Sequence, residues 1–209
     1  MDNFRKLEEI FTKFPGIGPR QARRFVYHIL SRPNSMVSEF IKLVSEVRKQ
    51  TNECSMCHRL FWHQNSSIKI STNAGLCSTC ADKNRDGNIL VIVARDSDFE
   101  SIEKSGAYKG LYFILGGTIP ILDKEPEKRI HLELLLHHIK NRPDLTEIIL
   151  SLNTTPDGEN TIEIIKDAIL KIIDSTKVKI TVLGRGLSTG AELEYADSET
   201  IRNAIKNRG

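Results

Sequence analysis

The chain has 209 residues, of which 39% are hydrophobic and 27% are charged, as is ordinary for a soluble globular protein. No run approaches the roughly 18–20 apolar residues that cross a bilayer, and the N-terminus lacks the apolar stretch of a secretion signal, so we expect a cytoplasmic protein without membrane contact. The net charge of +3 is uneven, because residues 1–50 contain ten Lys/Arg and five Asp/Glu, whereas residues 89–209 contain sixteen and nineteen. This imbalance indicates either that a polyanion binds the N-terminal part or that its surface is simply charged and solvated.

Residues 1–50 form the first predicted module, which contains three helices. Apolar residues recur at helical spacing in each of them: Leu7, Ile10, Phe11 and Phe14 in the first, Ala22, Phe25, Val26, Ile29 and Leu30 in the second, and Phe40, Ile41, Val44 and Val47 in the third. The segment Pro15–Pro19 separates the first two helices, and its last proline suits the first turn of a helix.

The turn between the first two helices is the candidate DNA-binding site. Gly16 and Gly18 have no Cβ, so the backbone there can turn tightly and approach a ligand closely. The amide groups and the positive dipole end of the second helix form an anion site suited to a DNA phosphate, and Arg20, Arg23 and Arg24 add charge-assisted hydrogen bonds. The pattern resembles a helix–hairpin–helix, which binds the DNA backbone without reading sequence. A plain helical hairpin with a glycine turn is the alternative.

Residues 51–86 form a second module that contains all four cysteines of the chain. Cys54 and Cys57 make one Cys-x-x-Cys pair, Cys77 and Cys80 make another, and nineteen residues lie between the pairs. Each two-residue spacer lets one tight turn direct two thiolates at the same metal ion. The pattern therefore predicts one structural Zn²⁺ site without an open position for catalysis, and a redox pair or unrelated thiols are the alternative.

The segment between the two cysteine pairs contains further groups of interest. His58 and His63 are either competing metal ligands or neighbouring surface groups. Leu60–Trp62 and Ile68–Ile70 predict a small β-hairpin, whose aromatic side chains either stack on nucleic-acid bases or pack inside the module.

Residues 87–190 alternate strands with helices, which predicts an α/β domain with a mainly parallel sheet covered on both faces. The predicted strands are 89–93, 111–115, 147–152 and 178–183. The predicted helices are 97–105, 127–141, with His137 and His138 at its surface, and 159–174. A capped helix that begins at Asp197 or Ser198 is expected in the C-terminal extension, 191–209. The predicted fold class is a multi-module α+β protein.

These features in this order resemble the RecR family of bacterial recombination mediators. The likeness spans nearly the whole chain and includes two specific blocks, Tyr112–Gly117 (YFILGG) and Gly190–Asp197 (GAELEYAD). The resemblance implies a Toprim domain in the α/β segment and places the family's basic helix–hairpin–helix positions on Arg20 and Arg24. It also implies a ring-like homo-oligomer on DNA, with a tetramer suggested, that acts with RecO and RecF in loading recombinase.

The resemblance does not extend to the acidic residues of an active Toprim site, so we expect no enzymatic activity. Such a site places a Glu after the first strand and spaced aspartates after the third to hold magnesium. Ala94 and Arg95 follow the first strand here, and Asn153 and Thr155 follow the third. The sequence therefore favours a DNA-binding mediator. The alternatives are a magnesium-dependent phosphotransferase, which would use Asp157, and a protein scaffold without DNA binding.

Overall fold

The computed structural model describes residues 2–62, 75–123, 125, 128–173 and 176–207. The chain divides into two compact units, of which the N-terminal unit ends at Thr51 and the second begins at Asn52. Within the described residues, no helix is both long and apolar enough to span a bilayer.

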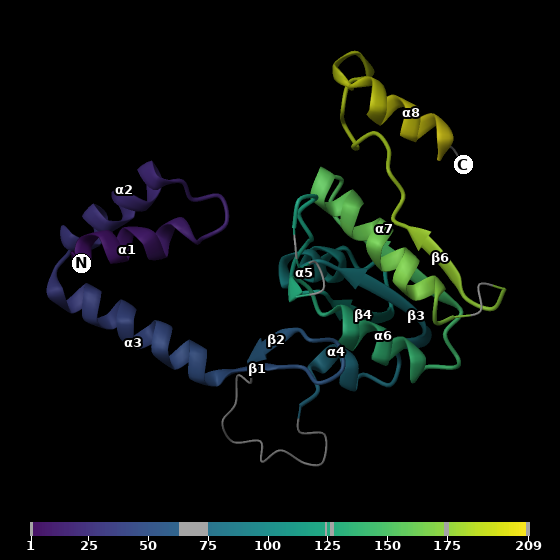
Figure 1. Cartoon of the computed structure of the whole chain (residues 1–209), viewed down its shortest axis with the longest axis horizontal. Helices are drawn as coiled ribbons and strands as arrows, with labels where there is room; N and C mark the ends of the chain where they lie inside the picture. The colour runs from purple at the N-terminus through teal and green to yellow at the C-terminus, as the bar shows by residue number, and fades with distance from the viewer. Residues whose placement is uncertain (1, 63–74, 124, 126–127, 174–175, 208–209) are drawn as a thin grey trace. The chain divides into compact units, whose positions relative to one another are not determined.

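The N-terminal unit is helical, as predicted (Figure 1). Its helices are α1 (Asn3–Thr12), α2 (Pro19–Leu30) and α3 (Asn34–Gln50). The first two pack against each other through a small core of Phe11, Ala22 and Val26. Among the described residues of α3 none is buried, although the helix is rich in apolar side chains.

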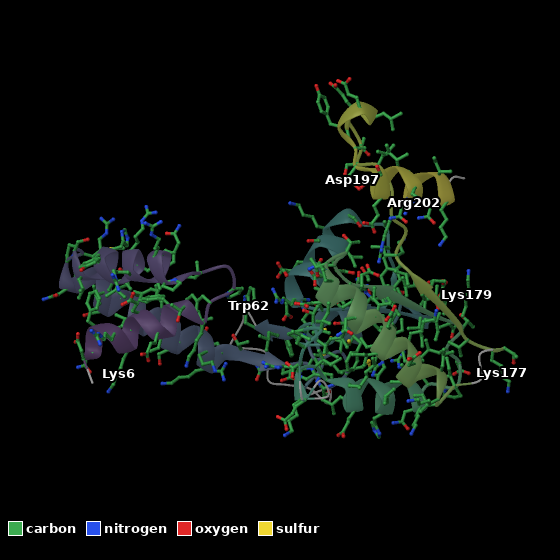
Figure 2. All side chains as sticks on the ribbon, turned by 45° about the horizontal axis from the view of Figure 1, so that its top comes forward. Lys6, Trp62, Lys177, Lys179, Asp197 and Arg202 are labelled. Atoms are coloured by element: carbon green, nitrogen blue, oxygen red, sulfur yellow. The ribbon has the colours of Figure 1, made fainter. Side chains whose placement is uncertain are left out.

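The cysteine module opens the second unit. Strands β1 (Thr51–Glu53) and β2 (Leu60–Trp62) form a two-stranded sheet, and a short helix, α4 (Ser78–Ala81), begins within the second cysteine pair. The predicted strand at 60–62 is therefore present, whereas 68–70 lies outside the described residues. Of the two aromatic residues in β2, Phe61 packs inside the module and Trp62 is 58% exposed (Figure 2).

A four-stranded, fully parallel sheet forms the centre of the second unit. Its strands are β3 (Asp86–Val93), β4 (Gly110–Ile114), β5 (Glu147–Ser151) and β6 (Lys179–Val182). They are hydrogen-bonded in the order β4-β3-β5-β6, so that β4 lies at one edge of the sheet. All four strands overlap the predicted ones, and the parallel arrangement confirms the predicted α/β architecture.

Helices cover both faces of this sheet, because successive side chains of a strand point to opposite faces. On one face Leu90 and Ile92 pack with the helices α6 (Leu132–Lys140) and α7 (Pro156–Leu170). On the other face Val91 and Val93 pack with the helix α5 (Asp96–Ser105) through Phe99. Strand β4 and residues 90–93 of β3 are consequently buried on both sides, which explains their continuous apolar sequences, whereas β6 at the other edge has no buried residue.

Two predicted helix boundaries were wrong. The helix expected from residue 127 begins at Leu132, because His131 is hydrogen-bonded to the residue that follows β4: its backbone N–H donates to the Leu115 carbonyl at 2.8 Å. The helix expected from residue 159 begins at Pro156, because Thr155 caps it by accepting a hydrogen bond from the Gly158 N–H at 3.2 Å. A proline at the first helical position is compatible with this earlier start.

The C-terminal extension contains the expected capped helix, α8 (Ser198–Lys206). The side chain of Asp197 accepts hydrogen bonds from the N–H groups of Glu199 and Thr200, both at 2.9 Å (Figure 2). After the helix, the Asn207 side chain donates to the Arg185 carbonyl at 2.8 Å and so ties the extension to the segment that follows β6.

Candidate nucleic-acid interface and metal centre

The glycine turn links α1 and α2 and leaves its backbone open. Gly16 has a φ of +76°, a left-handed conformation that favours glycine. Gly18 has extended backbone and is the N-cap of α2, and a Cβ added there would meet no atom within 4 Å. Packing therefore does not require glycine at position 18. The space beside its backbone is free for a ligand to approach.

The beginning of α2 is suited to an anion. The first N–H groups of a helix have no partner within the helix, and the first turn of α2 contains no acidic side chain that would compete for them. Gly18 offers no capping side chain either. The positive end of the helix dipole is thus directed at an open surface.

The three arginines that the sequence points to differ in their surroundings. Arg20, Arg23 and Arg24 are all exposed on α2. Arg23 forms an ion pair with Glu8 of α1 at 3.1 Å, which braces the hairpin, and Arg24 donates to Gln21 at 3.3 Å. The three residues lie within about one and a half turns of the helix, on the same segment as the glycine turn.

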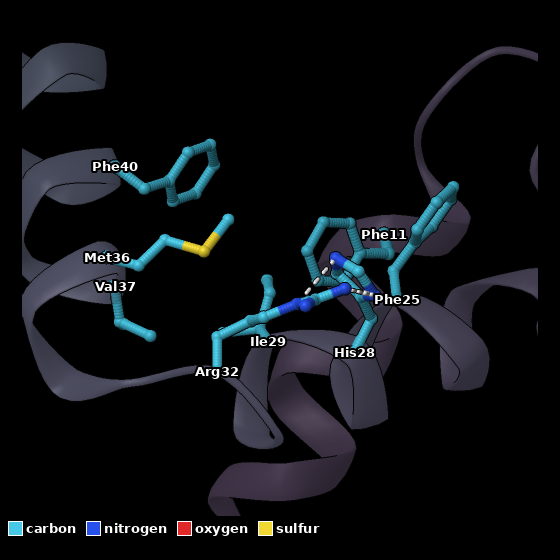
Figure 3. A pocket seen from close by; sticks show the side chains of 8 residues that line it. All are labelled: Phe11, Phe25, His28, Ile29, Arg32, Met36, Val37 and Phe40. Carbon is cyan, nitrogen blue, oxygen red and sulfur yellow. Dashed lines mark hydrogen bonds between the residues drawn. The ribbon is translucent and has the colours of Figure 1, made fainter.

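A groove of about 270 Å³ lies between this hairpin and α3 in the N-terminal unit (Figure 3). The side chains of Arg32 and His28, which are hydrogen-bonded to each other, form part of its lining. The rest of the lining is apolar and comes from α1, α2 and α3: Phe11, Phe25, Ile29, Met36, Val37 and Phe40. Further along α3, Ile41, Val44 and Val47 are each more than half exposed. Clustered exposed apolar side chains of this kind are typical of interaction surfaces.

The four cysteines converge on one point. Cys54, Cys57 and Cys77 are buried, Cys80 is half-buried, and the four sulfur atoms all lie within 4.8 Å of one another. The Cys57 and Cys77 sulfurs are 3.7 Å apart, far beyond the length of a disulfide bond. Four convergent thiols without a disulfide are a donor set that fits a tetrahedral metal ion.

Crowding of the thiols perturbs their acidity. Hydrogen bonding with Cys57 is the largest of the effects that lower the pKa of Cys54 below the ordinary thiol range. The same interaction raises the pKa of Cys57 above it. A bound cation would replace the protons of these thiols and stabilise all four as thiolates.

The cysteine module is attached to the edge strand of the sheet. The Cys57 carbonyl accepts a hydrogen bond from the Ile114 N–H of β4 at 2.8 Å. The guanidinium of Arg59 lies 4.1 Å from the centre of the Phe99 ring, a cation–π contact. No pattern in the sequence predicts these contacts, since they join residues that are distant in the chain and belong to no local motif.

His58, one of the two histidines considered as competing ligands, lies beside the cysteine centre and outside its ligand group. Its ring contacts Glu53 and His131 in a separate cluster. His63 lies outside the described residues. The prediction that His138 is a surface group was wrong: burial, with a contribution from Arg142, lowers its pKa to about 4, and it packs edge-on against Phe113.

Three of the carboxylates near the strand ends, those of Asp96, Asp98 and Glu159, have structural partners. Asp96 accepts a hydrogen bond from the Leu60 N–H at 2.9 Å, and Asp98 accepts from the Arg95 N–H at 3.0 Å. Glu159 is paired with Arg185. Within the part of the chain that the structure describes, none of these three carboxylates joins a group of three or more side chains that could hold a metal ion.

Comparisons with known proteins cover almost the entire chain. Residues 4–47 match the family described as "RecR, helix-hairpin-helix", residues 88–184 match "Toprim domain", and residues 186–208 match "RecR, C-terminal". Recombination protein RecR of Lactobacillus acidophilus is 30% identical over 202 residues, which is 97% of this chain and 94% of that protein. Recombination protein RecR of Staphylococcus aureus strain Newman is 34% identical over 203 residues, with the same coverage. The chain therefore belongs to the RecR family of recombination proteins.

Proposed function

We propose that this protein is a recombination mediator that binds the DNA backbone through the glycine turn before α2. The observation that supports this most directly is the open N-terminus of α2, where Gly18 leaves the backbone accessible and Arg20 and Arg24 add positive charge. A phosphate bound there would accept hydrogen bonds from the backbone and from the arginines, as a sequence-independent contact does.

We further propose assembly into a homo-oligomer, a tetramer by family resemblance, that acts with RecO and RecF to load recombinase. The exposed apolar side of α3 supports an association surface, since monomers rarely expose such a face. The partnership with RecO and RecF rests on the resemblance alone. The DNA-bound role and the unpaired thiols, which a reducing compartment preserves, favour the cytoplasm.

For the cysteine centre we propose one structural Zn²⁺ per chain, held by Cys54, Cys57, Cys77 and Cys80. Four thiolates in two Cys-x-x-Cys pairs are the usual ligands of structural zinc. We also propose that the chain divides into four parts at residues 50, 86 and 190. These are the helical N-terminal module, the cysteine module, the α/β domain and the C-terminal extension.

We propose that the Toprim domain has no catalytic activity and serves assembly and protein contacts. Ala94, Asn153 and Thr155 occupy positions where an active site needs carboxylates. Of the carboxylates near the strand ends, Asp96 accepts a hydrogen bond from a backbone N–H and Glu159 is paired with an arginine.

Replacing both Arg20 and Arg24 by alanine is expected to weaken DNA binding about tenfold, since two exposed charged contacts contribute roughly 1 kcal/mol or less each. Fluorescence anisotropy with labelled single-stranded and duplex DNA at several salt concentrations measures the affinity. On duplex DNA the slope of log affinity against log salt should become shallower by about 0.9 for each phosphate that the variant no longer neutralises.

The matched control is Arg48→Ala/Lys49→Ala, which removes the same charge from the exposed last turn of α3. This variant should keep most of the affinity. An equal weakening in both double variants would mean that net charge alone acts, and an unaffected Arg20/Arg24 variant would favour the scaffold without DNA binding at this turn.

A further inference from the structure

A second cluster of metal-binding side chains lies beside the cysteine centre. Glu53 on β1, His58 directly after the first cysteine pair, and His131 directly before α6 each offer one ligand atom, and these atoms all lie within 4.8 Å of one another. The residues come from the cysteine module and from the α/β domain, both within the second unit. Only the folded chain brings His131 to the other two.

The cysteine pair fixes the position of His58. Its backbone N–H donates to the Cys54 carbonyl at 2.9 Å, and its φ of +61° is the one positive value found at a non-glycine residue in the described ranges. The imidazole is held between Glu53, whose carboxylate lies 2.7 Å from Nδ1, and the Phe113 ring, whose centre is 5.1 Å away. A side chain held on several sides gives up little freedom when it binds a ligand.

His131 is oriented in the same way. Its Nδ1 lies 3.3 Å from the Ile114 carbonyl, which accepts a hydrogen bond and thereby leaves the lone pair on Nε2. Such a backbone partner is the usual arrangement behind a metal-bound histidine. A Cβ at Gly116 would come within 3.4 Å of Nε2, so glycine at this position leaves room for the ring.

We propose that Glu53, His58 and His131 bind a divalent transition-metal ion such as Zn²⁺, at a site separate from the four cysteines. Two imidazoles and a carboxylate suit zinc and its neighbours, whereas magnesium and calcium prefer oxygen ligands alone. Three protein ligands leave the fourth tetrahedral position open to water or to another group.

The ion can reach this site from solvent. His58 also lines an open pocket of about 430 Å³, and Glu53 is exposed on its short strand. Tetrahedral zinc with bonds of about 2.0–2.1 Å needs ligand atoms roughly 3.3–3.5 Å apart. Binding would therefore move the Glu53 carboxylate away from the His58 Nδ1, which lies 2.7 Å from it, and adjust the other ligand atoms, which already lie within 4.8 Å of one another. The bound ion would link the cysteine module to the α/β domain, beside the Cys57–Ile114 hydrogen bond.

The test is to count the zinc ions bound to the untagged full-length protein by equilibrium dialysis against increasing Zn²⁺, followed by atomic emission. We expect the wild type to level off at two ions per chain and His131→Ala at one. His137→Ala is the matched control, since it removes an exposed histidine of α6 that is outside the cluster, and it should still bind two.

Two further readouts distinguish removal of the site from unfolding of the chain. Cobalt in the cysteine centre gives intense thiolate-to-metal absorption, and the second equivalent should add only weak visible bands, which His131→Ala lacks. Zinc beyond the first equivalent should raise the unfolding temperature of the wild type and His137→Ala but not of His131→Ala. Glu53→Gln, on an exposed position, should weaken the second ion as well.

A wild type that levels off at one ion overturns the proposal. It is equally overturned if His131→Ala and Glu53→Gln both still bind a second ion with wild-type affinity. Loss of the second ion from the control His137→Ala, to the same extent as from His131→Ala, would overturn it too.

Discussion

Cys57→Ser is expected to abolish metal binding at the four-cysteine centre and to unfold the cysteine module. So short a segment has little core of its own, since its buried residues are mainly the cysteines and Phe61. Metal binding of this kind contributes on the order of 10 kcal/mol to folding. Metal content of protein purified in zinc-free buffer should fall by one ion per chain, and the Ile114 amide, whose acceptor is the Cys57 carbonyl, should exchange faster with solvent.

Ser78→Ala is the control for this variant, because it changes an exposed residue between Cys77 and Cys80 without removing a ligand. It should retain the metal and the slow exchange at Ile114. Retention of a full complement of metal by Cys57→Ser would show that three thiolates or another donor suffice, and would contradict the closed four-thiolate centre.

Gly158→Ala is expected to destabilise the protein by about 1–3 kcal/mol, the usual cost of forcing extra volume into a packed site. A Cβ at this position would overlap the Asn153 carbonyl oxygen, which is backbone and cannot rotate away. Helix propensity alone predicts the opposite sign, because alanine is favoured over glycine by about 1 kcal/mol within a helix. Urea unfolding of the wild type and of Gly158→Ala measures whether the free energy of unfolding falls or rises.

Gly184→Ala serves as the comparison, since a Cβ there would meet no atom within 4 Å. Its free energy of unfolding should stay close to that of the wild type. A Gly158→Ala variant that is as stable as wild type would mean that the loop from Asn153 to Thr155 relaxes readily, and that glycine is not required for its shape.

Most of the fold could be predicted from the sequence where local pattern and tertiary structure agree. The strands were recognisable because burial on both faces makes them continuous apolar runs such as Ile89–Val93. The start of α7 was missed although Thr155 and Pro156 are helix-start signals. The start of α6 could not be found locally, because the hydrogen bond from His131 to Leu115 depends on the fold.

The candidate sites also differ in whether a local sequence pattern predicts them. The cysteine spacing pointed directly to the cluster that the structure contains, because two short turns determine the geometry of the ligands. The approach of His131 to His58 has no signal in the sequence, since the two residues are 73 positions apart and meet only through the packing of α6 and β4. Whether the arginines of α2 contact DNA stays a prediction, which the binding experiment above tests.

The hydrogen bond between Cys57 and Ile114 has a consequence for the handling of the protein. β4 is an edge strand with five buried residues, and an uncovered edge of this kind is a template for pairing with strands of other chains. The turn that carries Cys54 and Cys57 covers part of that edge through this hydrogen bond. With the zinc that we propose for the four cysteines absent, this turn would release the Ile114 N–H for pairing with a strand of another chain, so zinc supply during synthesis should lower the aggregated fraction of the protein.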